Sequence, residues 1–127
     1  SDLTPLQNAD RLRQLNVEDT DVSDLSPIFS GVPPLEDLYA NRLGASDDSL
    51  TTVEGIGSLT TLTRIDLQGN TALNAGVGEI ANLPNLSLVD LWGSTSIPAV
   101  DVTAIEDANV GNTGFRLVRP DGSEFTQ

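Results

Sequence analysis

The sequence predicts an α/β fold: a right-handed solenoid whose concave face carries a short parallel β-sheet, with 3₁₀ or short helical segments and loops on the convex face. Three observations predict it. One apolar spacing recurs four times along the chain, each recurrence contains the alternation typical of a half-buried strand, and apolar residues spaced by three follow it. Self-similarity at a period of about 20 to 50 residues indicates a fold built by stacking equivalent units.

The stretch from Thr61 to Leu83 contains this spacing in full. It reads Leu62-x-x-Ile65-x-Leu67-x-x-Asn70-x-x-Leu73, followed by Val77, Ile80 and Leu83. Successive side chains of a strand point to opposite faces, so Ile65 and Leu67 are expected to point into the core. Asn70 is expected to turn the chain and to donate its amide to backbone carbonyls of the adjacent coil.

The other units repeat the spacing less completely. The first leucines of all four units lie at positions 12, 35, 62 and 86, which gives steps of 23, 27 and 24 residues. Thr20, Leu43 and Ser94 occupy the position of Asn70 in the first, second and fourth units. The longest step contains an insertion of about five residues, Gly44 to Asp48, which is expected to project as an exposed loop.

A single domain over residues 1–127 is therefore expected, with a half repeat at 1–11, repeats at about 12–34, 35–61, 62–85 and 86–109, and a C-terminal cap at 110–127. The segment Ser1–Leu6 repeats Ser23–Ile28 almost letter for letter, and the latter is the second half of a unit. The chain is thus expected to begin within a repeat, as a fragment of a longer protein.

The segments that follow the strands are expected to be short. Their apolar residues are spaced by three, which favours a turn of 3₁₀ helix or a short α-helix over a long helix. Prolines recur along them, and proline interrupts helices. Six of the prolines bear on this expectation: Pro5, Pro27, Pro33, Pro34, Pro84 and Pro98.

The period predicts one more strand near the C-terminus. Adding 24 to Leu86, Val89 and Leu91 gives positions 110, 113 and 115. Pro120-Asp121-Gly122 is a turn signal, so residues 115–118 and 123–125 are expected to pair as a terminal hairpin. The same step places Arg116 beside Trp92, where the guanidinium group could cover the indole as a cation–π pair.

The ends of two units have a further signature. Asp24-Leu25-Ser26-Pro27-Ile28 and Asp2-Leu3-Thr4-Pro5-Leu6 share an acidic residue, an apolar residue, Ser or Thr, proline and an apolar residue. With this signature and the spacing LxxLxLxxN, residues 1 to about 105 resemble bacterial leucine-rich-repeat proteins of the internalin type. The resemblance implies a recognition module in a larger bacterial protein, secreted or on the cell surface, that binds through its concave sheet.

Composition narrows the choice of partner. The net charge is −13, from 19 acidic residues against 6 arginines and no lysine. Phosphate backbones and anionic membranes attract basic surfaces, so no nucleic acid partner is expected. There is no run of 18 apolar residues, so no membrane insertion is expected, and there is no cysteine for a disulfide or a thiolate metal site. We therefore expect no cofactor.

Strand parity predicts three columns of outward side chains. They comprise Gln14, Asp37, Arg64 and Leu88; then Asn16, Tyr39, Asp66 and Asp90; then Glu18, Asn41, Gln68 and Trp92. The only tyrosine and the only tryptophan of the chain fall in these columns, and aromatic and arginine side chains dominate binding energies at interfaces. We expect a protein or glycan ligand to contact Tyr39, Trp92, Arg64, Asp66, Asp90, Leu88, Asn41 and Gln68.

Three alternatives remain open at this stage. The domain could be a passive spacer that holds other domains apart. It could hydrolyse glycosides, because Asp66 and Asp90 lie at one level of adjacent strands, about 4.8 Å apart, near the separation of about 5 Å in retaining glycosidases. It could bind calcium through Asp47 and Asp48, or through Asp66 and Asp90, although no EF-hand spacing is present. The absence of histidine, cysteine and lysine disfavours nucleophilic catalysis, and we expect no enzyme activity.

Overall fold

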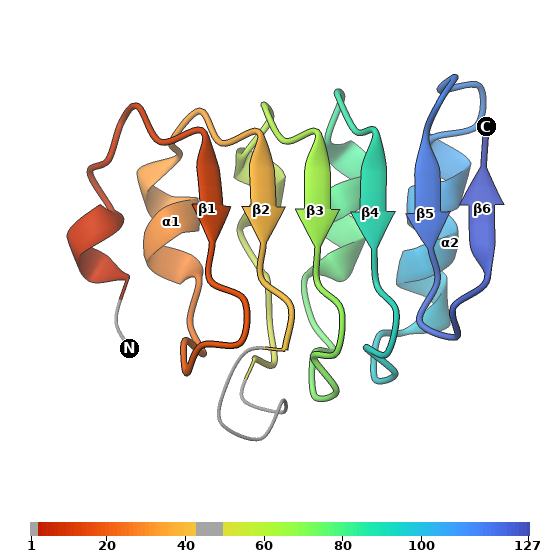
Figure 1. The fold of residues 1–127 in the computed structure, drawn as a ribbon. Helices are drawn as coiled ribbons and strands as arrows, with labels where there is room; N and C mark the ends of the chain where they lie inside the picture. The colour runs from red at the N-terminus through yellow and green to blue at the C-terminus, as the bar shows by residue number, and fades with distance from the viewer. Residues whose placement is uncertain (1–2, 43–49) are drawn as a thin grey trace.

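The protein is an α/β domain built on one open, mostly parallel six-stranded sheet (Figure 1). The computed structural model describes residues 3–42 and 50–127. The strands lie side by side in chain order, and only the last pair is antiparallel. They are β1 (Gln14–Asn16), β2 (Asp37–Tyr39), β3 (Arg64–Asp66), β4 (Leu88–Asp90), β5 (Arg116–Val118) and β6 (Glu124–Thr126).

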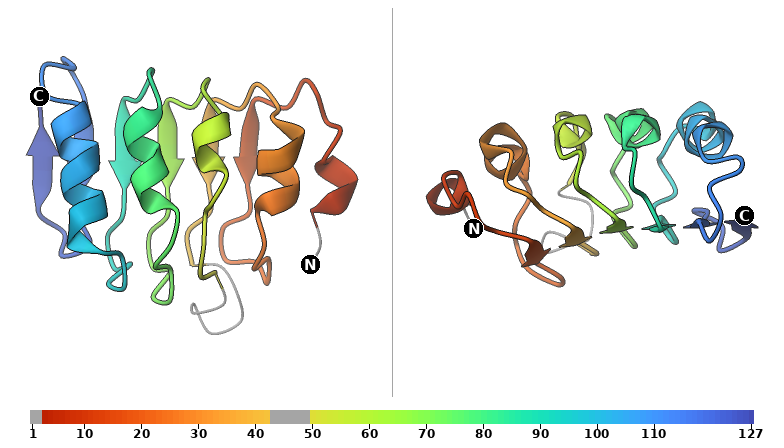
Figure 2. Two further views of the ribbon diagram at one scale, coloured as in Figure 1. Left: turned by 180° about the vertical axis from the view of Figure 1, so that it is seen from behind. Right: turned by 90° about the horizontal axis from the view of Figure 1, so that it is seen from above.

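The helical segments all lie on one side of this sheet (Figure 2). In chain order they are η1 (Thr4–Leu6), α1 (Ser26–Gly31), η2 (Ile56–Ser58), η3 (Val77–Asn82) and α2 (Ala99–Ala108), where η denotes 3₁₀ helix. Each packs against the next along the chain. No helix among the described residues covers the other side of the sheet, where the outward side chains of the strands lie.

The predicted strand register is confirmed. Leu15 pairs with Leu38, Leu38 with Ile65 and Ile65 with Val89. The central residue of each of these strands is buried and its two neighbours are more exposed, as alternation requires. The sheet thus advances by the predicted steps of 23, 27 and 24 residues.

The core lies between the sheet and the helical segments. Ile65 and Leu67 are fully buried, and the apolar residues predicted to follow the third strand, among them Leu73, Val77 and Ile80, are buried with them. Because these residues recur in every unit, the buried side chains form one continuous cluster from Leu3 to Leu117.

A buried polar ladder joins neighbouring units beside this core. The Asn70 amide donates to the carbonyls of Ala40, at 2.9 Å, and Leu67, at 3.0 Å, which confirms its predicted role. The Ser94 hydroxyl, at the equivalent position, donates to the Leu67 carbonyl and accepts from the Asn70 backbone N–H at 2.9 Å. Such bonds satisfy backbone groups that the coil would otherwise leave buried without partners.

Carboxylates join the helical segments in a similar way. Glu79 of η3 accepts hydrogen bonds from the backbone N–H groups of Gly55 and Gly57, at 3.1 Å each, and these residues begin η2. Asp101 of α2 lies close to the preceding segment η3, since a methyl group at Gly78 would stand 3.0 Å from its Oδ1. An acidic side chain near a helix N-terminus meets unpaired N–H groups, so the contact of Glu79 fixes η2 against η3.

The C-terminal hairpin is confirmed, but its predicted register is wrong. Strands β5 and β6 pair antiparallel around the turn at Asp121 and Gly122. However, Val89 pairs with Leu117, a step of 117 − 89 = 28 residues instead of 24. The cause is α2, a ten-residue helix where shorter segments occupy the preceding units.

Two further expectations concern the inserted loop and insertion into a membrane. The predicted loop at Gly44 to Asp48, together with Leu43, lies outside the described residues. Within the described ranges, none of the helices combines the length and the apolar character needed to cross a bilayer.

Candidate functional site

The predicted outward columns lie on the face of the sheet that no helix covers. Tyr39 stands level with Asp66, and Asp66 with Asp90, as parity predicted. The third column continues beyond the strands, where the N–H of Arg42 donates to the Gln68 carbonyl and that of Gly69 to the Trp92 carbonyl. Asn41, Gln68 and Trp92 are therefore held at one level across three units.

Amides and carboxylates bind one another diagonally across this face. Asn41 Nδ2 donates to Asp66 Oδ2 at 3.0 Å, and Gln68 Nε2 donates to Asp90 Oδ2 at 2.6 Å. The other oxygen of each carboxylate accepts the backbone N–H two residues on, from Gln68 and Trp92 respectively. Each carboxylate is thus bound by two donors, which fixes the side chains of Asn41 and Gln68.

The carboxyl group of Asp90 has a shifted pKa. Partial burial raises the pKa of its carboxyl group above the ordinary value, and the nearby charge of Asp66 acts in the same direction. Hydrogen bonds from the Trp92 N–H and the Gln68 amide oppose this rise, as does the charge of Arg116. The ionised form is therefore held by specific donors in a partly desolvated position.

Tyr39 and Arg64 form a separate pair. Arg64 Nη1 donates to the Tyr39 hydroxyl at 3.3 Å, so the tyrosine is tied to the neighbouring strand. Tyr39 is half-buried, whereas Arg64 is exposed. The sequence placed these two residues in one binding site with Trp92, but the structure places them at the level of the strands, outside the lining of the pocket described next.

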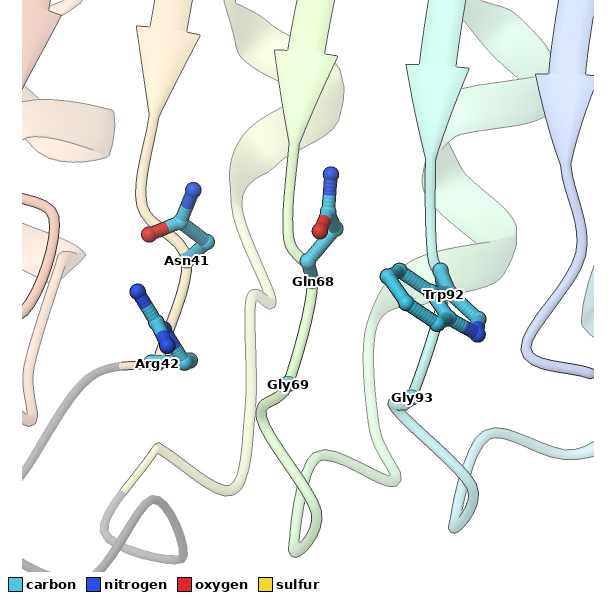
Figure 3. A pocket seen from close by; sticks show the side chains of 6 residues that line it. All are labelled: Asn41, Arg42, Gln68, Gly69, Trp92 and Gly93. Carbon is cyan, nitrogen blue, oxygen red and sulfur yellow. The ribbon is translucent and has the colours of Figure 1, made fainter. Parts of the chain in front are cut away.

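A pocket of about 340 Å³ opens where the chain leaves the sheet (Figure 3). Hereafter the Trp92 pocket, it is lined by Asn41, Arg42, Gln68, Gly69, Trp92 and Gly93. The indole of Trp92 stands on one side and the side chains of Asn41 and Arg42 stand on the other, with Gln68 between them. Of the eight predicted site residues, only Asn41, Gln68 and Trp92 line it.

Sequence reasoning missed Arg42, Gly69 and Gly93. They follow the third column directly and adopt left-handed backbone angles, with φ of 50°, 69° and 80°, as does Asp19 of the first unit, with φ of 55°. Glycine adopts this conformation without strain. The recurrence of glycine at 69 and 93, one repeat step apart, was the signal that could have revealed this fourth column.

The predicted contact between Trp92 and Arg116 is wrong, because the longer last unit moves Arg116 to the level of Leu88. Arg116 instead forms an ion pair with Glu124 of β6. The residue beside the indole is Gly122: a methyl group there would lie 3.3 Å from both Cδ1 and Nε1 of Trp92. The hairpin turn therefore supports the pyrrole edge of Trp92, while 58% of the residue remains exposed.

The charges around the Trp92 pocket are largely paired. Arg42 binds Asp19 through two nitrogen–oxygen contacts, of 2.9 and 3.0 Å. Among residues 3–42 and 50–127, no three acidic side chains gather as a group that could hold a metal ion. Asp47 and Asp48, the other candidate calcium ligands, lie outside the described residues.

The fold and site together define an open α/β domain with a polar sheet face and an exposed pocket beside Trp92. Comparison with protein-family models, with curated proteins and with solved structures found no match for this chain. The functional argument therefore depends on the residues themselves.

Proposed function

We propose that this domain is a leucine-rich-repeat solenoid of the internalin-like type, and that it is a non-catalytic recognition module. It binds a protein or a glycan through the uncovered sheet face, which is the concave face of the solenoid. The regular register of the strands and the buried ladder from Asn70 to Ser94 support the repeat assignment. The resemblance in sequence supports a place in a larger bacterial protein at the cell surface or outside the cell.

One observation carries the binding role: Trp92 is 58% exposed above a pocket, while apolar side chains elsewhere in the described units are mostly buried. Full burial of a large apolar side chain stabilises a protein by about 1.5–3 kcal/mol, and Trp92 forgoes more than half of such burial. A spacer domain has no use for such exposure, whereas aromatic side chains anchor many interfaces. Binding therefore accounts for Trp92 better than a purely mechanical role does.

The two rival chemistries find less support. In a retaining glycosidase one carboxyl group must act as an acid and the other as a nucleophile. Here Asp66 and Asp90 each accept two hydrogen bonds from the protein, and both lie on an open sheet face. The same bonds occupy the oxygens that a calcium ion would need. These carboxylates are better suited to positioning Asn41 and Gln68.

The test is to select ligands without bias and then to locate their contact residues with variants of the sheet face. The purified domain is screened against a printed array of defined glycans and against a random peptide library displayed on phage. Selected ligands are then measured on Trp92→Ala and Tyr39→Ala, with Val100→Ala as the control, because Val100 is 72% exposed on α2 behind the sheet. A contact surface predicts unchanged melting temperatures and a loss of affinity of about 30-fold at a hot spot.

Two outcomes would remove the proposal. Every selected ligand could bind both face variants as tightly as the parent, which would place the preferred surface elsewhere. Alternatively, the screens could yield no ligand, as the spacer alternative predicts.

A further inference from the structure

We propose that the Trp92 pocket binds a neutral pyranose ring, that is, one sugar unit of an uncharged glycan. The inference rests on the proposed function and narrows it to one ligand class. It is carried by the shape of the pocket, by the exposed indole, by an acceptor held in place by Asp90, and by the absence of free charge.

The shape suits a small flat ring. The pocket volume of about 340 Å³ lies near the lower end of small-ligand sites, which span about 300–1,000 Å³. Gly69 and Gly93 contribute no side chains. The stem of Arg42 packs over Gly69, where a methyl group would stand 2.5 Å from its Cγ, and the pocket extends from there to Trp92 (Figure 3). Hydrogen bonds between backbone groups fix the floor of the pocket, because the Gly69 N–H donates to the Trp92 carbonyl at 2.9 Å.

The indole is presented as a platform. Its Nε1 points away from Gln68, toward the hairpin turn at Gly122, so its six-membered ring lies on the pocket side (Figure 3). The face of an aromatic ring carries partial negative charge. The C–H groups of a pyranose carry partial positive charge and stack on such a face, whereas its hydroxyl groups point outward to polar side chains.

Gln68 supplies a matching polar group. Because its Nε2 donates to Asp90 Oδ2 at 2.6 Å, the orientation of the carboxamide is fixed. Its Oε1 then faces the opposite way, toward the pocket (Figure 3). Across the described part of the chain no donor binds that oxygen, so it can accept a hydrogen bond from a sugar hydroxyl.

The charge distribution favours an uncharged ligand. Arg42 is the cation that the described residues contribute to the lining, and it is already paired with Asp19. Asp66 and Asp90 lie just above the pocket, and the chain carries a net charge of −13, which repels acidic sugars. Among the described residues, the lining contains no aliphatic side chain, whereas peptide ligands are usually anchored by apolar side chains in apolar pockets.

The single tryptophan provides a direct readout, because all indole fluorescence of the protein comes from Trp92. The domain is titrated with neutral hexasaccharides of β-1,4-linked glucose, β-1,4-linked N-acetylglucosamine, α-1,4-linked glucose and β-1,4-linked mannose, and with an oligogalacturonate as the acidic comparison. At least one neutral series should change the emission saturably, and the acidic sugar should not. Calorimetric titration then follows the same sugar on variants without relying on the indole.

The variants separate the parts of the site. Gln68→Leu removes the acceptor and should weaken binding by about tenfold, the effect of losing one hydrogen bond of about 1.4 kcal/mol. Trp92→Ala should abolish detectable binding, and Val100→Ala, on the opposite side of the sheet, should leave it unchanged. Melting temperatures close to that of the parent would show that the variants are folded.

The failures of the two proposals are distinguishable. The pyranose site is refuted if no neutral sugar binds at about 1 mM, or if a bound sugar retains its affinity in Trp92→Ala. If sugars fail while selected peptides lose affinity in Trp92→Ala, the face is a recognition surface for protein and only the ligand class is wrong. If neither sugars nor peptides depend on Trp92 or on Tyr39, both proposals fail.

Discussion

Two aspartates of this domain carry opposite pKa shifts. Partial burial raises the pKa of Asp90, so its folded state binds a proton more readily than the unfolded chain does. The hydroxyl group and the backbone N–H of Ser123 lower the pKa of the exposed Asp121, so its folded state favours ionisation. Linkage turns these differences into opposite contributions to the pH dependence of stability.

Replacing each aspartate by asparagine should reveal the two opposite contributions to the pH dependence of stability. For Asp90, the folded state loses stability as pH rises from below the ordinary carboxyl pKa through the raised one, so Asp90→Asn should gain on the parent as pH rises above about 4. For Asp121, the contribution is present above the ordinary pKa and is lost as pH falls, so Asp121→Asn should lose stability relative to the parent only at higher pH. Urea unfolding from pH 3 to 7 measures both differences. Parallel curves for the two variants would contradict the assignment.

A pair of glycines separates backbone strain from steric conflict. Gly76 and Gly111 have nearly equal φ angles of +84° and +83°. A methyl group at Gly76 would lie 2.3 Å from the backbone nitrogen of Glu54, in the neighbouring unit, whereas at Gly111 nothing lies within 4 Å. The surroundings, and not the conformation, distinguish the two positions.

Gly111→Ala should therefore cost about 1–2 kcal/mol, the strain of a left-handed alanine. Gly76→Ala should cost clearly more, because backbone of two packed units would have to separate. Chemical denaturation of the two variants in parallel tests this, with Gly114→Ala as a second open control. Equal losses at Gly76 and Gly111 would mean that the units are not packed as closely as described.

At the scale of an element, the strand and the turn that follows it depend on the burial of Leu67. This side chain is fully buried between neighbouring units. Leu67→Ala should cost about 2–5 kcal/mol, whereas Leu67→Asp should prevent folding because it buries an unpaired charge. Circular dichroism during thermal melting distinguishes a lowered midpoint from an absent transition. A normal transition for Leu67→Asp would refute the strand register.

Elements with strict apolar spacing were predictable from the sequence. The inward position of Ile65, its pairing with Leu38 and Val89, and the bonds of Asn70 all follow from alternation and from the need to satisfy buried carbonyls. The length of the last unit was not predictable. The spacing of Ile97, Val100 and Ile105 indicated a short helical segment, whereas α2 spans ten residues, buries Val102 and leaves Val100 exposed. That difference in length displaced every residue after it by four positions.

The candidate site was predictable only in part, for a related reason. Parity identified Asn41, Gln68 and Trp92 as outward residues, since it depends on position within a strand. It gave no indication of Arg42, Gly69 or Gly93, because these residues lie beyond the strands and their φ angles are not a periodic property. Nor could it place Gly122 against Trp92, because that contact depends on the length of α2.

At the scale of the whole molecule, charge is the dominant global property. Nineteen acidic residues face six arginines, so repulsion among exposed carboxylates outweighs the ion pairs that arginines such as Arg13 form with Glu36. Exposed pairs of this kind contribute at most about 1 kcal/mol each. The folded state brings the remaining charges together, which opposes compaction.

The protein should therefore become more stable as salt is added. The screening length falls from about 30 Å at 0.01 M to about 3 Å at 1 M ionic strength, which removes most repulsion between exposed charges. Urea unfolding in increasing sodium chloride measures the effect, and an equal series in sucrose controls for general exclusion from the surface. Stability that falls with salt would mean that ion pairs, and not repulsion, dominate the surface.

The left-handed residues Asp19, Arg42, Gly69 and Gly93 have a consequence for protein engineering. At each of them the chain leaves the sheet in the same conformation, after the last hydrogen bond that fixes the register. The number of residues that follow can therefore differ between units, as the 27-residue step after β2 demonstrates. Random segments inserted after Asn70 or Ser94, which complete the buried ladder, would emerge near the Trp92 pocket without shifting a strand. The domain is thereby a natural framework for combinatorial libraries, in which a fixed aromatic anchor is surrounded by variable loops.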